Sequence, residues 1–176
     1  MAKTLISTST ASASATLDIT SGIDSTYSVY EFHFVNMHPA SDNVHFVFQA
    51  NASGGSGFNE TMTTTAFDQW NSESGSSGNM SYGLDQAQGT VYQHVAISVG
   101  HDADDNGAGI LTLYAPSSTT YVKHFTARFH TKYWTVYTYT THTAGYINTT
   151  SAIDEISFKM SSGNMDAGVI KMFGVS

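Results

Sequence analysis

The sequence predicts an all-β protein with a single domain, folded as an antiparallel β-sandwich. Apolar and polar residues alternate with a period of two along many short segments. Turn-forming Gly, Ser and Asn clusters separate these segments, and only 2 prolines interrupt the 176 residues. The apolar spacing of an amphipathic helix hardly occurs. Among sandwiches, we expect a jelly roll first and an immunoglobulin-like fold second.

Strong alternation marks the strands of the first half of the chain. In the first of them Tyr30, Phe32 and Phe34 share one face, and the same pattern recurs in the next two. These strong runs cover 27–37, 44–49 and 91–99, and weaker ones lie near Leu5, Leu17 and Thr61. Turn residues separate them at 38–39, 52–57 and 72–79.

The second half continues in the same way and brings the expected total to about ten strands. Phe125, Ala127 and Phe129 alternate with polar residues. The strong runs here cover 121–130, 155–160 and 168–175, with weaker ones near Leu111 and Tyr137, and turns at 102–109, 116–118 and 161–164. Composition does not shift along the chain, so we expect one sandwich domain over 15–176. The Ser/Thr/Ala-rich segment 1–14 predicts a flexible N-terminal arm.

Composition excludes several classes of function. The chain has 14 acidic and 6 basic residues and a net charge of −8, so its dispersed cations cannot form a nucleic-acid footprint. It has no long apolar run and no basic cluster, so we expect no membrane partner and no signal peptide. Zero cysteines exclude disulfides, thiolate zinc sites and a cysteine nucleophile. Flat, uncharged Thr-rich strands such as 133–143 favour pairing with another chain, and hence a homo-oligomer.

Two groups of residues could bind metals. Asp102, Asp104 and Asn106 match the first half of an oxygen-ligand calcium loop, but Leu113 stands where the loop needs a bidentate Glu. Asp, Asn and Gly are also ordinary turn residues, and we favour a structural turn. The 8 histidines lack compact ligand spacing with a carboxylate nearby, which favours exposed or interface positions. We therefore expect neither a metal nor a cofactor.

Catalytic motifs are missing as well. No serine stands in a nucleophile elbow, and Asp154 and Glu155 point to opposite faces of one strand instead of facing each other across a cleft. The Gly-rich segment 54–57 is not followed by Lys-Ser/Thr or a helix, so a phosphate loop is not indicated. We expect no enzymatic activity and no catalytic residues.

An aromatic run provides the candidates for surface recognition. Trp134, Tyr137 and Tyr139 lie in a Thr-rich segment, with Trp70 elsewhere in the chain. Aromatic faces beside hydroxyl groups suit sugar rings, so a host glycan is a candidate ligand. Aromatic and Thr residues are also common in strands, where they form core or interface.

Three stretches resemble small virion structural proteins of tailed phages that infect marine bacteria, especially cyanophages. They are 21–43, 109–126 and 144–175, and the last ends in the motif Gly-x-Ile-Lys-hydrophobic-aromatic-Gly at 168–174. The resemblance covers most of the chain and implies a particle component without transferring any ligand residues.

We therefore expect a structural protein on the exterior of a phage particle. The first hypothesis is a capsid decoration or cement protein that binds the major capsid protein or other virion proteins as a homo-oligomer, with a trimer favoured. The second is a tail fibre or accessory protein that recognises host glycan.

Overall fold

The computed structural model describes residues 2–133 and 135–176, and this part of the chain contains twelve strands and no helix. The strands are β1 (Lys3–Thr10), β2 (Leu17–Ile19), β3 (Val29–Pro39), β4 (Val44–Ala52), β5 (Met62–Ser72), β6 (Gly78–Tyr82), β7 (Gln93–Val99), β8 (Gly107–Tyr114), β9 (Lys123–Lys132), β10 (Tyr137–Ile147), β11 (Ile153–Met160) and β12 (Met165–Val175). Since no helix is present in these residues, none could cross a membrane.

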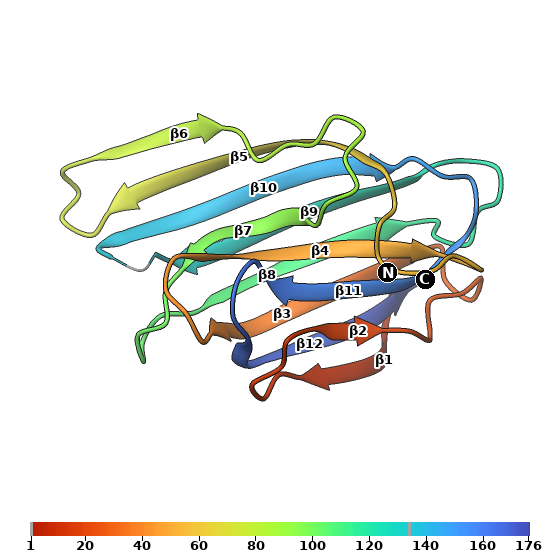
Figure 1. The fold of residues 1–176 in the computed structure, drawn as a ribbon, viewed down its shortest axis with the longest axis horizontal. Helices are drawn as coiled ribbons and strands as arrows, with labels where there is room; N and C mark the ends of the chain where they lie inside the picture. Colours follow the sequence, from red (N-terminus) through yellow and green to blue (C-terminus); the bar gives the residue numbers. More distant parts are fainter. Residues whose placement is uncertain (1, 134) are drawn as a thin grey trace.

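The strands form two antiparallel sheets that pack face to face in a single domain (Figure 1). The larger sheet has eight strands in the order β1-β12-β3-β8-β9-β10-β5-β6, and the smaller has four in the order β2-β11-β4-β7. The all-β antiparallel prediction is therefore confirmed. The larger sheet is the wider of the two, and Figure 1 shows β5 and β6 beyond the last strand of the smaller sheet.

Phenylalanines from both sheets form the centre of the core. Phe158 of β11 lies 5.2 Å from Phe34 and 5.6 Å from Phe32, both on β3, between ring centroids. Phe48 of β4 meets Phe125 of β9 at 4.9 Å. All five side chains are buried, as the period-two pattern predicts for the inward face of each strand.

Strands extend into several of the predicted turns. The turn expected at 38–39 lies inside β3, which runs to Pro39, and β8 begins at Gly107, within the turn expected over 102–109. The sequence predicts a turn over 72–79, but β5 continues to Ser72 and β6 begins at Gly78. Ser72 Oγ accepts a hydrogen bond from the Ser77 N–H at 3.1 Å, which closes the tighter turn. Strand β6 was not predicted, because it is short, all of its residues are exposed, and its first residues continue the Gly/Ser/Asn-rich stretch that predicts a turn.

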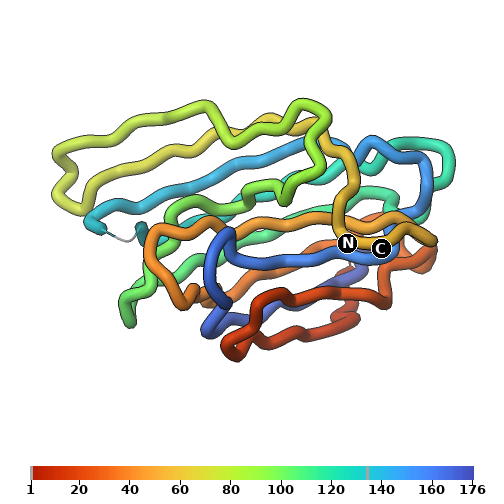
Figure 2. Tube along the Cα trace, in the orientation of Figure 1, coloured from red at the N-terminus to blue at the C-terminus, as the bar shows by residue number. Residues whose placement is uncertain are grey.

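The two ends of the chain lie side by side (Figure 2). Ala2 and Ser176 exchange two backbone hydrogen bonds, of 3.1 and 3.2 Å. The segment predicted as an arm, 1–14, contains β1, which pairs with β12 from Lys3 to Thr10. The flexibility of this segment stays a prediction.

Candidate functional site

The aromatic residues of the Thr-rich segment gather where β10 pairs with β5. Tyr139 lies directly opposite Trp70 in the register of these strands. On the same face of β10, Thr143 donates its hydroxyl to the backbone oxygen of His94 on β7, at 3.1 Å. Side chains of a strand alternate between its faces, so Tyr139 shares the face of Thr143 but lies closer to the end of the sheet.

Four rings form one cluster, which we call the aromatic cluster: Trp70, Tyr133, Tyr137 and Tyr139. The Tyr133 and Tyr139 rings stack with centroids 4.7 Å apart, and Trp70 stacks on Tyr139 at 6.1 Å. Tyr137 packs edge-on against Trp70 at 5.2 Å. Each ring is half-buried. The cluster therefore presents aromatic surface to solvent, unlike the fully enclosed phenylalanines of the core.

A carboxylate lies beside these rings. Asp68 comes two residues before Trp70 on β5 and is buried on the same face. Burial raises the pKa of Asp68, and a hydrogen bond with Ser81 of β6 partly opposes this shift. Burial raises the pKa of Tyr139 too, and the charges of Tyr133 and Asp68 act in the same direction. Half-buried aromatic rings can stack on the face of a sugar ring, and tyrosine hydroxyls can exchange hydrogen bonds with its hydroxyl groups.

The structure thus brings together two of the three predicted recognition residues, Tyr137 and Tyr139. The third, Trp134, lies outside the described residues. Sequence reasoning missed Asp68, although a signal existed: in a strand, positions 68 and 70 face the same way.

The segment that matches half of a calcium loop, 102–106, is held by a lysine. Lys132 of β9 pairs with the carboxylate of Asp105 and lies 3.6 Å from that of Asp104. The Asp105 N–H donates to the Asp102 oxygen at 2.8 Å, which closes a turn. Across the described residues, no three His, Cys, Asp or Glu side chains are arranged to hold a metal ion.

Two half-buried histidines form a pair in the smaller sheet, His45 on β4 and His94 on β7. The His45 and His94 rings meet at 4.8 Å, edge to face. Burial lowers the pKa of His94 to about 4, and the nearby His45 adds to this shift. Burial lowers the pKa of His45 as well. His45 Nδ1 accepts the N–H of Ser98 at 3.2 Å, a role that only an unprotonated nitrogen can fill.

Comparisons with known proteins identify no family for this chain. No family model matches the chain, and no curated protein matches its sequence.

Proposed function

We propose that this protein is a structural component of a tailed-phage virion, located on the particle exterior, where it decorates or cements the capsid. The resemblance of three stretches to virion proteins of marine phages supports the proposal that the particle is a tailed phage. The main structural support for attachment to the particle is the exposed edge strand β6, which is free to pair with a strand of another chain.

We also propose that the sandwich is a jelly roll. Four strands (β5, β6, β9 and β10) extend the larger sheet at one side. Without them, the two sheets have the orders β1-β12-β3-β8 and β2-β11-β4-β7. The eight remaining strands then pair first with last, second with seventh, third with sixth and fourth with fifth. A ribbon paired in this nested way and rolled into two sheets is a jelly roll, a fold that viral capsid domains use.

Strand β6 has the properties of an edge that pairs with another chain. It is the last strand of the larger sheet, all of its residues are exposed, and it has no charge, proline or register shift. Met80 and Tyr82 project from it with 62% and 71% of their surface exposed. The opposite edge, β1, has the usual protection of a charged residue, Lys3, and a bulge between Leu5 and Ser7.

This edge bears on the oligomeric state that we expect. Antiparallel pairing of β6 with a second β6 would be isologous and would close a two-fold dimer. The favoured trimer instead requires a heterologous contact in which β6 meets a different surface of its neighbour. The same edge could bind the major capsid protein or another virion protein.

Immunogold labelling of intact virions tests the proposal. An antibody against this chain is applied to particles of the phage that encodes it, and the label is located by electron microscopy. Label over the head supports the decoration role. Label confined to the tail contradicts that role, and a particle without label contradicts the virion proposal itself.

The aromatic cluster favours a second candidate function, the recognition of a host-surface glycan by a tail fibre or accessory protein. Under this proposal, the purified protein binds host cells and competes with infection, and Tyr139→Ala abolishes both effects. Tyr121→Ala is the matched control, because Tyr121 is exposed in the loop that leads into β9, at the opposite end of that strand from Tyr133. Equal binding by the two variants would contradict a recognition role for the cluster.

A further inference from the structure

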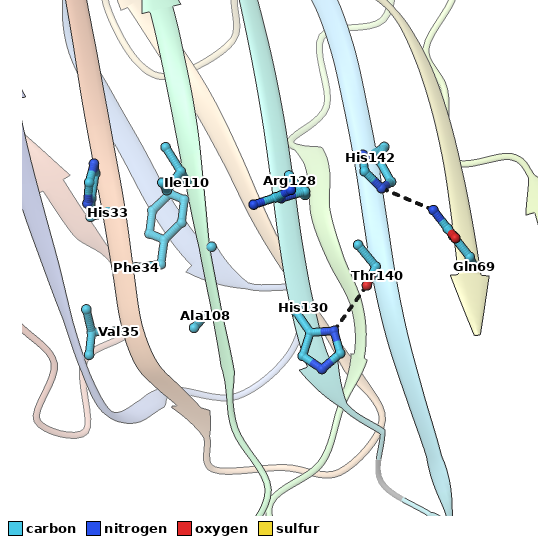
Figure 3. Close-up of a pocket in the computed structure, with 11 residues that line it drawn as sticks. His33, Phe34, Val35, Gln69, Ala108, Ile110, Arg128, His130, Thr140 and His142 are labelled. Atoms are coloured by element: carbon cyan, nitrogen blue, oxygen red, sulfur yellow. Dashed lines mark hydrogen bonds between the residues drawn. The ribbon is translucent and has the colours of Figure 1, made fainter. Parts of the chain in front are cut away.

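The outer face of the larger sheet holds a groove of about 720 Å³ across β3, β8, β9, β10 and β5 (Figure 3). This volume is typical of ligand sites. Register places its side chains in two rows that run across the strands. His33 lies opposite Ile110, Ile110 opposite Arg128, and Arg128 opposite His142.

The second row completes the groove. Ala108 lies opposite His130, His130 opposite Thr140, and Thr140 opposite Gln69. Arg128 therefore has one histidine beside it on β10 and another two residues along its own strand. This face is opposite to that of the aromatic cluster, because side chains alternate along β10.

Charge in the groove runs against the composition of the whole chain. The chain has 14 acidic and 6 basic residues, yet none of the described residues that line the groove is acidic. The side chain of Arg128 is exposed, and its guanidinium makes neither an ion pair nor a hydrogen bond with any other residue of 2–133 and 135–176. Glu31, a carboxylate on the same face, is already engaged by Lys3 and His33 at 2.7 Å each.

The side chains around Arg128 are held in place. His142 stacks on Phe67, with ring centroids 4.8 Å apart, and its Nε2 lies 3.4 Å from the amide nitrogen of Gln69. His130 has hydroxyl partners on both ring nitrogens, Thr140 at 3.1 Å and Thr138 at 3.0 Å. The Arg128 guanidinium is thus a fixed positive charge among ordered polar side chains, and a bound anion would supply the partner that it lacks.

The remaining wall is apolar. Val35 and Ile110 are exposed on the β3 and β8 side, with 41% and 37% of their surface open. A ligand that fits the groove therefore has an anionic group for Arg128, hydroxyls for Gln69 and Thr140, and an apolar face for Ile110. A pyranose ring with a carboxylate combines all three.

We propose that this groove binds an acidic saccharide, with the carboxylate of a uronic-acid residue paired to Arg128. The groove is lined by no residue of β6 or of the aromatic cluster, so its failure would leave the proposed function standing.

Calorimetric titration with trigalacturonate, and with neutral galactotriose as the comparison ligand, tests the site. We expect trigalacturonate to bind the intact chain with a dissociation constant of about 1 mM or tighter, and more weakly as salt is added. Arg128→Gln should weaken this binding roughly ten- to hundredfold. Ala108→Glu, which places a carboxylate in the groove, should abolish it.

Lys159→Gln is the matched control, because it removes one positive charge from β11 of the other sheet, where Lys159 lies over the Tyr92 ring. Circular dichroism checks that each variant is folded. The absence of binding at about 10 mM ligand, equal binding of galactotriose, or unchanged affinity in Arg128→Gln would each overturn the proposal. A change in oligomeric mass in Arg128→Gln would overturn it too, because the face would then be a protein interface.

Discussion

Phe158 contacts phenylalanines of both sheets, so its ring couples the two halves of the core. It lies 5.2 Å from Phe34 of the larger sheet and 5.9 Å from Phe46 of its own sheet. Phe158→Ala removes the ring where the surroundings are closely packed, and the cavity left behind adds to the lost burial. We expect the free energy of unfolding to fall by ~3–5 kcal/mol, measured by urea denaturation.

Phe173→Ala is the control for this prediction. Phe173 is half-buried on the outer face, with its ring 4.7 Å from that of His33. The same truncation should cost less than half as much there. Equal losses in the two variants would show that Phe158 is not central to the core.

The His45–His94 pair predicts a loss of stability in acid. The pKa of His94 is lowered from 6.5 to about 4 in the folded protein, so the unfolded chain binds more protons between these values. Stability therefore falls as the pH drops through this window, by on the order of 2 kcal/mol after allowance for partial exposure. Protonation of His45 would also remove its hydrogen bond with the Ser98 N–H.

Thermal unfolding between pH 7 and 4 measures this effect. His94→Gln should flatten the dependence of the melting temperature on pH. His101→Gln is the control, since Asp42 raises the pKa of the exposed His101. A pH dependence in His94→Gln as steep as in the unchanged protein would contradict the prediction.

The sequence could not predict which side chains become neighbours on adjacent strands of a sheet. Tyr139 and Trp70 are far apart in the chain, and only the register of β10 against β5 makes them neighbours. Arg128 and His142 come together in the same way. Period-two alternation assigns a residue to a face, whereas its neighbours on that face depend on long-range pairing.

At the level of single strands, the edge strand β6 leads to a prediction about assembly. Met80→Lys places a charge on this edge, which natural sheets use to prevent pairing with other chains. We expect the unchanged protein to be an oligomer in solution and Met80→Lys to be smaller. Light scattering coupled to size-exclusion chromatography measures the mass.

Thr10→Lys on β1 is the matched control, because it adds the same charge to the opposite edge of the larger sheet. If Met80→Lys retains the full mass while Thr10→Lys does not, the assembly edge is β1 and not β6.

Prediction from sequence worked best where strands are half-buried. Strand β3 alternates clearly because its inward residues, including Tyr30 and Phe32, are buried. Strand β6 contributes no buried side chain, and only Met80 and Tyr82 alternate along it, which is too short a run to predict a strand. Val91 and Tyr121 were assigned to strands but are exposed in the loops that lead into β7 and β9.

For the molecule as a whole, alternation was sufficient to predict an all-β antiparallel domain. It could not predict that four additional strands would extend one sheet to eight while the other sheet has four. The alternation of a strand shows which residues face the core, but not which strand is its hydrogen-bonded neighbour. The extension bears on both proposed sites, since Trp70, Tyr137 and Tyr139 of the aromatic cluster lie on β5 and β10, and the groove takes Arg128 and both of its neighbouring histidines from β9 and β10.

The nested pairing of the eight other strands also implies an order of folding. The innermost pair joins Phe48 to Gln93, and the outermost joins Lys3 to Val175. Closing the long loop between Lys3 and Val175 costs about 1 kcal/mol more in chain entropy than closing the short loop between Phe48 and Gln93. Pairing is therefore favoured to begin at β4 and β7 and to proceed outward. Strand β1 then pairs last on folding and opens first on heating. Its amides should exchange with deuterium faster than those of β4, and the slot it vacates beside β12 is a second place where a neighbouring chain could insert a strand.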